Sequence, residues 1–131
     1  MAHFGQVDIL VNNAGMQHIS KVEEFPEETW EKVISLNLSS AFYTSRYALP
    51  GMKERKWGRI INIASVHGLV ASVNKSAYVA AKHGIVGFTK ASALECAKSG
   101  VTINAICPGF ILTPLIQKQI DIIAEQRKVS N

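Results

Sequence analysis

Two side chains that could act together in proton transfer, Tyr78 and Lys82, lie four residues apart in the stretch 76–90. On a helix that spacing places both side chains on one face, about one turn apart. A phenol has an ordinary pKa of about 10, and a fixed ammonium nearby lowers that pKa because it favours the phenolate. The pair could therefore act as a general acid and base. It could also be an ordinary surface pair, and only the surrounding elements can separate the two interpretations.

Three short apolar segments predict the strands that would position this pair. Residues 7–11, 59–64 and 101–106 are rich in Val and Ile, and each is followed by polar or glycine residues. Such uninterrupted apolar runs are typical of strands covered on both faces of a parallel sheet. The polar residues after each run mark where the strand leaves the sheet.

Helical patterns separate these segments. Pro26 and the acidic residues after it predict a helix start, and the apolar period then continues to about residue 57. Because that span is long, we expect a bend near Asn37 or a distortion near Pro50.

The Ala-rich stretch 76–98 and an amphipathic stretch that begins at Thr113 predict two more helices. Strands that alternate with helices predict an α/β fold, a doubly wound parallel sheet with right-handed crossovers. In such sheets ligands bind where the carboxyl ends of the strands meet. We therefore expect Ser65, at the end of the second strand, to lie near Tyr78 and Lys82.

Composition places the chain among globular proteins. Its 131 residues suffice for one domain, with 47% hydrophobic residues, 18% charged residues and a net charge of +4 spread along the chain. The chain has no basic stripe interleaved with aromatic residues, so nucleic acid is not expected as a partner. It has neither an apolar run of about 18 residues nor a signal sequence, so we expect a cytoplasmic protein without a membrane partner. Cys96 and Cys107 form no disulfide framework, and the histidines show no metal-binding spacing, so no metal is expected.

Five features, in this order and spacing, resemble the short-chain dehydrogenase/reductase family. They are Asn12-Asn-Ala-Gly15, Asn37 in the long helix, Ser65 after the second strand, Tyr78-x-x-x-Lys82, and Pro108-Gly109 with Thr113. The resemblance covers essentially the whole chain. It implies one partial domain, 1–131, with a Rossmann-like parallel sheet and NAD(P)-dependent oxidoreductase activity.

The resemblance also implies a role for each residue. Tyr78 would exchange a proton with the substrate oxygen during hydride transfer, Lys82 would lower the pKa of Tyr78, and Ser65 would donate a hydrogen bond to the substrate carbonyl. Asn37 would hold a water that links Lys82 to solvent. The cofactor would be contacted by Asn12, Ala14, Gly15, Tyr78, Lys82, Pro108, Gly109 and Thr113. Taken singly, Asn37 and the residues at the strand ends also have a plain interpretation as bend, turn or loop residues.

Within the family, the likeness is closest to bacterial-type D-3-hydroxybutyrate dehydrogenases. It rests on Gln17-His18, on SVHGLVAS at 65–72, on KSAY at 75–78 and on LTPLIQKQ at 112–119. It implies oxidation of D-3-hydroxybutyrate to acetoacetate, with substrate bound by Gln17, Ser65, His67, Lys75, Tyr78 and Gln119. A small acid offers few atoms, so an ammonium and several hydrogen-bond donors must orient it. Phe110 stands where the family usually has Trp, which could shift the preference to another 3-oxoacyl substrate.

Two parts of the family pattern are not in this chain: the first βαβ half with its Gly-rich phosphate-binding loop, and the final strand. NAD is the expected cofactor, with NADP not excluded. Two hypotheses stand. The chain is the catalytic part of an oxidoreductase that forms a homo-oligomer at full length, or it is a non-catalytic truncated chain that at most associates with full-length subunits. A serine hydrolase built on Ser65 and His67 is disfavoured, because the chain has no G-x-S-x-G motif.

Overall fold

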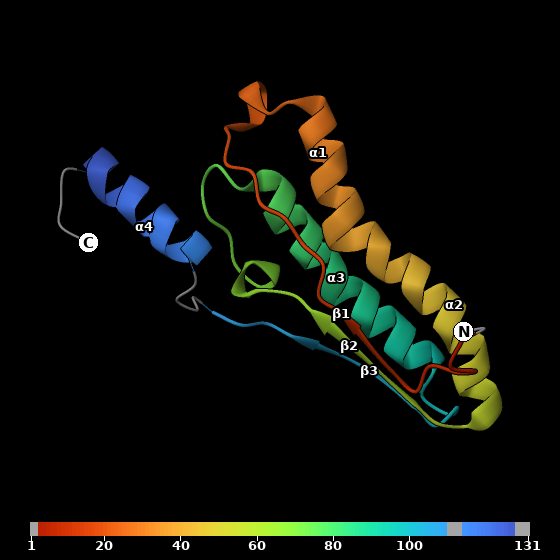
Figure 1. The fold of residues 1–131 in the computed structure, drawn as a ribbon. Coiled ribbons are helices and arrows are strands. Elements are labelled where there is room, and N and C mark those ends of the chain that lie inside the picture. Colours follow the sequence, from red (N-terminus) through yellow and green to blue (C-terminus); the bar gives the residue numbers. More distant parts are fainter. Residues whose placement is uncertain (1–2, 110–113, 128–131) are drawn as a thin grey trace.

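The computed structural model describes residues 3–109 and 114–127 (Figure 1). Its helices and strands in chain order are β1 (Ile9–Asn12), α1 (Glu27–Ile34), α2 (Ser40–Arg55), β2 (Gly58–Ile63), α3 (Ser76–Glu95), β3 (Val101–Ile106) and α4 (Pro114–Arg127). Two 3₁₀ turns, Val22–Glu24 and Val66–Gly68, and a π-helical turn, Ser35–Ser39, lie between them. The predicted alternation of strands and helices is confirmed.

The three strands form one parallel sheet in the order β1-β2-β3. Pairing of β1 with β2 begins at Ile9 and Arg59, and β2 pairs with β3 along its whole length. The carboxyl ends of all three strands therefore meet at one edge, as predicted. Figure 1 shows α1, α2 and α3 together on one side of this sheet.

The other face of the sheet is open within the described residues. Alternate side chains on it remain exposed, among them Ile9 at 56%, Val11 at 51% and Ile106 at 51%. The apolar runs predicted strands covered on both faces, and the described helices cover one. A row of exposed Ile and Val of this kind has the character of a surface that another layer would cover.

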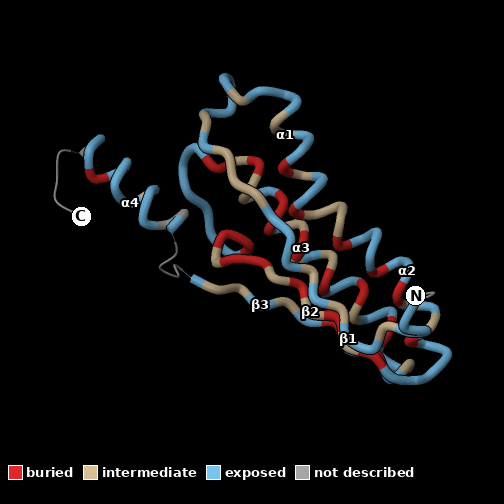
Figure 2. The backbone as a smooth tube through the Cα atoms, in the orientation of Figure 1, coloured by how far each residue is buried: buried red, intermediate tan, exposed pale blue. Residues whose placement is uncertain are grey.

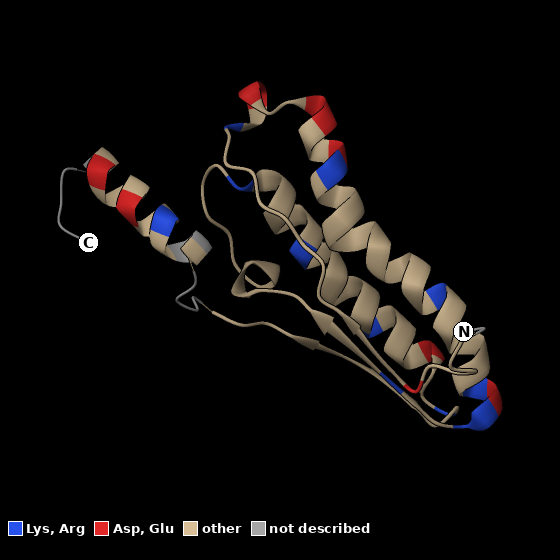
Figure 3. Ribbon diagram, viewed as in Figure 1, with Lys and Arg blue, Asp and Glu red and all other residues tan. Residues whose placement is uncertain are grey.

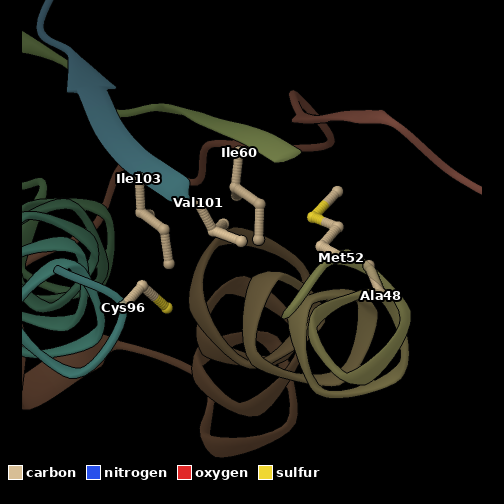
Figure 4. Close-up of a cluster of buried hydrophobic side chains, with 6 residues drawn as sticks. All are labelled: Ala48, Met52, Ile60, Cys96, Val101 and Ile103. Atoms are coloured by element: carbon tan, nitrogen blue, oxygen red, sulfur yellow. The ribbon is translucent and has the colours of Figure 1, made fainter. Parts of the chain in front are cut away.

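The core lies between the sheet and the helices on its covered face, where Figure 2 shows the buried positions of α2 and α3. Six buried side chains pack together there (Figure 4): Ala48, Met52, Ile60, Cys96, Val101 and Ile103. A Cβ added at Gly58 would come within 2.5 Å of the Met52 sulfur, so the glycine allows α2 to lie close to the start of β2. A second cluster, of Ala41, Ala64 and Ile85, lies by the carboxyl end of β2.

The long helical stretch is interrupted by the π-helical turn Ser35–Ser39, at the bend expected near Asn37. Such a wider turn often marks a functional site, and here it carries the buried side chain of Asn37. Pro50 lies inside α2, which nevertheless continues to Arg55 and ends at Lys56 in the left-handed conformation. Figure 3 shows Lys and Arg gathered at this helix end, as expected for side chains that complement the helix dipole.

A series of side-chain hydrogen bonds, here called the asparagine network, runs beneath the sheet from α2 to α3. Thr44 Oγ1 donates to Asn12 Oδ1 over 2.6 Å, and Asn12 Nδ2 donates to Asn62 Oδ1 over 2.8 Å. Asn62 Nδ2 then donates to Thr89 Oγ1 over 2.9 Å. Asn62 is fully buried, so these bonds satisfy amide groups that water does not reach.

Several predicted boundaries shift by a few residues in the structure. The second strand covers Gly58–Ile63 rather than 59–64, and the long helical stretch ends at Arg55 rather than near residue 57. The first strand covers Ile9–Asn12 rather than 7–11, because its pairing with β2 begins only at Ile9. Helix α3 ends at Glu95 rather than at residue 98, because the chain turns at Cys96, whose backbone is still bonded to the last helical turn. Among residues 3–109 and 114–127, no helix is both long and apolar enough to cross a membrane.

Candidate active site

A pocket of about 290 Å³ lies where the carboxyl ends of the strands meet the start of α3. It is lined by Asn13, Gly15, Met16, Gln17, Asn37, Ile63, Ala64, Ser65, Val66, His67, Lys75, Tyr78, Lys82, Pro108, Gly109 and Gln119. Most of these residues belong to the predicted catalytic, cofactor and substrate sets. The described lining contains two ammonium groups and no carboxylate, which suits an anionic ligand of modest size.

Helix α3 brings Tyr78 and Lys82 to this pocket on the same face, as their spacing predicted. The Lys82 Nζ lies 5.5 Å from the centre of the Tyr78 ring. The face of α3 toward the core is made of small residues, and Ala77 and Ala81 are fully buried. These small side chains let the helix approach the sheet closely enough for Lys82 to reach the end of β2.

Lys82 is a buried cation whose Nζ donates to the Ile63 carbonyl over 2.9 Å. Burial lowers the pKa of this ammonium below 10.5, and the nearby Cys107 acts weakly in the opposite direction. The bond to Ile63 uses one of the three N–H groups of the ammonium. The others remain for groups that enter the pocket.

Ser65 follows β2 in an extended conformation and caps the turn Val66–Gly68, accepting a hydrogen bond from the His67 backbone N–H over 3.1 Å. The His67 ring lies against both Ser65 and Tyr78: its Nδ1 is 3.5 Å from Ser65 Oγ, and its centroid is 5.9 Å from that of Tyr78. Its Nε2 is 2.8 Å from Ser72 Oγ. Burial lowers the pKa of His67 below 6.5, and the charges of Lys75 and His83 lower it further.

Asn37 holds the segment that follows β1. Its Nδ2 donates to the carbonyls of Met16 over 2.8 Å and of Val33 over 2.9 Å, and its Oδ1 accepts from Met16 N over 3.2 Å. A Cβ at Gly15 would come within 2.7 Å of Asn37 Oδ1 and 3.9 Å of Lys82 Nζ. Glycine at this position therefore allows the strand end to lie directly over the two side chains.

Three polar side chains of the predicted substrate set enter the pocket from other elements. Lys75, just before α3, is buried and takes part in a parallel bridge with Ser20. Gln17 has a buried Oε1 without a hydrogen-bond partner among the described residues. Gln119 reaches the pocket from α4.

Other predicted residues lie elsewhere. The Asn12 side chain is part of the asparagine network, and Asn12 and Ala14 do not line the pocket. Thr113 and Phe110 fall outside the described residues. The assignment of Asn12, Ala14 and Thr113 to cofactor binding, and the effect of Phe110 on substrate preference, stay predictions.

The structure adds lining residues that sequence reasoning missed. Asn13 and Met16 lie within or beside the matched Asn12–Gly15 segment, and Ile63 and Ala64 end the second strand, so proximity in sequence was the only available signal. Ser72, which contacts His67, gave no signal of its own. Among the described residues no three His, Cys, Asp or Glu side chains are placed to hold a metal ion.

The family model of the short chain dehydrogenases matches residues 1–122. The chain belongs to this family. As a short-chain dehydrogenase it is 65% identical over 126 residues to a D-beta-hydroxybutyrate dehydrogenase of Cupriavidus necator, covering 96% of this chain and 49% of that protein. It is 63% identical over 127 residues to the protein of the same name from Rhizobium meliloti, covering 97% of this chain and 49% of that protein.

A solved structure has the same fold. A variant of actinorhodin polyketide ketoreductase, crystallised with NADPH, superimposes with a TM-score of 0.90 at 42% identity. The match covers 98% of this chain and 50% of that one. This chain thus spans about half the length of the proteins it matches.

Proposed function

We propose that this chain provides the catalytic part of an NAD-dependent oxidoreductase that interconverts a small 3-hydroxy acid and its 3-oxo acid, with D-3-hydroxybutyrate and acetoacetate as the favoured pair. The observation that supports the proposal is the pocket itself. It joins the Tyr78–Lys82 pair and the Ser65 hydroxyl to the buried ammonium of Lys75, and its described lining has no carboxylate. The two relatives named D-beta-hydroxybutyrate dehydrogenase point to the same substrate.

In the oxidation direction, the substrate hydroxyl proton passes to the Tyr78 phenolate oxygen, which returns it to water through the pocket. The ammonium of Lys82 lies 5.5 Å from the centre of the Tyr78 ring, where it attracts negative charge on the Tyr78 oxygen during the transfer. Ser65 donates a hydrogen bond to the substrate oxygen and stabilises charge that develops there. A nicotinamide held beside Gly15 and Lys82 would take the hydride from the carbon that carries this hydroxyl, so that protons and electrons would balance.

The residues present fit the nicotinamide end of such a cofactor. Gly15 gives close access to Lys82, whose remaining N–H groups can donate to ribose hydroxyls. Pro108 and Gly109 line the same pocket, and a Cβ at Gly109 would meet no atom of the described residues within 4 Å.

The substrate carboxylate is held or oriented by Lys75, His67, Gln17 and Gln119, which line the same pocket. A charge-assisted bond to a buried ammonium is among the stronger hydrogen bonds in proteins. Gln17 Oε1 and a carboxylate can both only accept hydrogen bonds, so the Gln17 amide nitrogen is the group that donates to the ligand.

The decisive experiment is a chimera in which this chain replaces the aligned half of the Cupriavidus necator relative. We expect NAD reduction with D-3-hydroxybutyrate. Tyr78→Phe in the chimera lowers the rate at least about a thousandfold, since the proton acceptor is lost. Lys98→Ala, at an exposed position beyond the end of α3 and away from the pocket, is the control and keeps full activity. Undiminished turnover in Tyr78→Phe would remove Tyr78 from the mechanism.

A second candidate, a non-catalytic chain that associates with full-length subunits, is favoured by the open apolar face around Ile9, Val11 and Ile106. Activity of the chimera, together with calorimetric titration of the chain alone with NAD, separates the two. The catalytic-part proposal expects no tight binding alone but activity in the chimera, whereas the second candidate expects an inactive chimera. Micromolar affinity of the chain alone would contradict the view that it needs another segment to bind cofactor.

A homo-oligomer at full length is also part of the proposal. It is supported by exposed aromatic side chains on α2, Phe42, Tyr43 and Tyr47. Such a cluster on one helix is typical of subunit contacts. Sedimentation of the chimera tests it: Tyr43→Lys is expected to shift the species toward monomer.

A further inference from the structure

A second cavity, of about 310 Å³, lies between α4 and the loop that leads into α3. Figure 1 shows α4 next to this loop. We call it the aliphatic cavity after the Ile and Val side chains in its lining: Ile19, Val73, Ile120, Ile122 and Ile123. A cavity of this size is at the lower end of the range for small-molecule sites, and a mainly apolar lining with a few polar groups is usual for them.

The aliphatic side chains of this cavity remain exposed in the described structure. Their exposed fractions run from 38% at Ile120 to 84% at Val73, although they gather around one hollow. Exposed apolar side chains that cluster in this way are typical of a ligand or partner site, because removing them from water is favourable. A ligand with a hydrocarbon part would therefore be bound there.

Two polar side chains, Lys75 and Gln119, line both the aliphatic cavity and the pocket of the candidate active site. Lys75 is buried, and the described lining of the aliphatic cavity contains no other cation and no carboxylate. An ammonium in such surroundings forms a strong, charge-assisted hydrogen bond with an anion. The aliphatic cavity thus combines walls of hydrocarbon with one positive group that it shares with the active-site pocket.

We propose that the aliphatic cavity binds a medium-chain aliphatic monocarboxylate, with the carboxylate on Lys75 and the tail against the Ile and Val side chains. Burial of the tail supplies affinity, and the ammonium fixes the direction of the ligand. Tyr78 and Ser65 do not line the aliphatic cavity, so an acid seated there competes with the substrate for Lys75 without reacting. This competition rests on the proposed function, whereas the binding itself does not.

Calorimetric titration of the chain itself with butyrate, hexanoate and octanoate tests the binding without any turnover. Affinity is expected to rise about threefold to fourfold for each methylene that the cavity buries. 1-Octanol has the same tail but no charge, and it is expected to bind at least about tenfold more weakly than octanoate. Equal affinities for butyrate and octanoate, or for octanoate and 1-octanol, overturn the proposal.

Three variants of the chain locate the ligand. Ile123→Asn, which places an amide in the aliphatic wall, is expected to lower octanoate affinity about tenfold. Leu94→Asn, at an exposed position of α3 outside the cavity, is the matched control and leaves that affinity unchanged. Lys75→Met is expected to bring octanoate to the affinity of 1-octanol. Unchanged binding in Ile123→Asn or Lys75→Met overturns the proposal. So does a chain that binds no octanoate but loses self-association in sedimentation when Ile123 is replaced, because the cavity would then be a contact between copies.

Kinetics of the chimera test the competition. Octanoate is expected to raise the apparent KM for D-3-hydroxybutyrate and to leave kcat unchanged, because both acids need Lys75. Ile123→Asn is expected to weaken this inhibition about tenfold, while kcat and KM without octanoate stay within about twofold, since Ile123 does not line the active-site pocket. Inhibition that persists at saturating substrate overturns the shared use of Lys75. If the unsubstituted chimera is inactive, the proposed function fails, and the calorimetry still decides whether the cavity binds the acid.

Discussion

Removing the Asn37 amide tests whether its hydrogen bonds hold the π-helical turn against the segment that follows β1. Asn37 is 3% exposed and makes three hydrogen bonds, two with the backbone of Met16 and one with the Val33 carbonyl. Each such bond contributes about 1 kcal/mol net, while Ala gains roughly 0.5 kcal/mol in helix propensity over Asn. We therefore expect Asn37→Ala to lower the free energy of unfolding by about 2–3 kcal/mol, which lowers Tm by roughly 10 °C in a domain of this size.

Urea denaturation followed by circular dichroism measures this difference at fixed pH. Ser35→Ala, an exposed position in the same π-helical turn, is the matched control and should change the free energy of unfolding by less than about 0.5 kcal/mol. A loss below about 0.5 kcal/mol in Asn37→Ala would refute the idea that this side chain fastens the two segments together.

Asn37→Asp sharpens the test, because it keeps the shape and one acceptor but loses the two donated bonds. A carboxylate cannot donate to the carbonyls of Met16 and Val33, so the free energy of unfolding should still fall by about 2 kcal/mol at neutral pH. An unchanged free energy of unfolding in this variant contradicts the assigned amide orientation.

Three further outcomes follow from the structure. Gly100→Ala should lower the free energy of unfolding by more than about 2 kcal/mol, because Gly100 has a φ of 74° and a Cβ there would overlap the Lys56 carbonyl. Gly87→Ala, where no atom of the described residues lies within 4 Å of the added Cβ, should raise it by up to about 1 kcal/mol. Equal effects of the two variants in urea denaturation would contradict both expectations. The pKa of His67 lies below 6.5 in the folded chain, so just below pH 6.5 the unfolded chain binds more protons and the free energy of unfolding should fall as pH drops. In His67→Gln this dependence of unfolding free energy on pH should be shallower, and an equal dependence in both chains would contradict the expectation. In the chimera, Lys75→Met should raise KM for D-3-hydroxybutyrate roughly tenfold to a hundredfold with little change in kcat, since it removes one charge-assisted bond, and an unchanged KM would move the carboxylate away from Lys75.

Local patterns predicted the order of elements and the edge of the sheet that carries the pocket. The third strand is found at Val101–Ile106 as predicted, and the bend near Asn37 is a π-helical turn. These features depend on apolar periodicity and on residues near in sequence. They are therefore the part of a fold that a sequence determines most directly.

Contacts made across the fold could not be predicted in the same way. The resemblance pointed to Asn37, but its partner Met16 lies 21 positions away and is joined through backbone atoms that carry no sequence signal. The contact between Ser72 and His67 depends on the path of a loop, and the placement of Asn12 beneath the sheet depends on pairing between strands. In each case tertiary structure decides which of several equally polar groups a side chain meets.

The asparagine network has a consequence for how the strands find their alignment during folding. Hydrophobic burial alone selects the register of β1 and β2 weakly, because both strands carry apolar residues on both faces, and a slip of two keeps each side chain on its own face. In the observed register Asn12 is opposite Asn62. A slip of two would place Asn12 beside Ile60 or Ala64, and neither side chain can bond an amide. The buried amides thus reject the misaligned pairings of β1 and β2 that hydrophobic burial alone would accept, and they keep the ends of these two strands in register at the edge that carries the pocket.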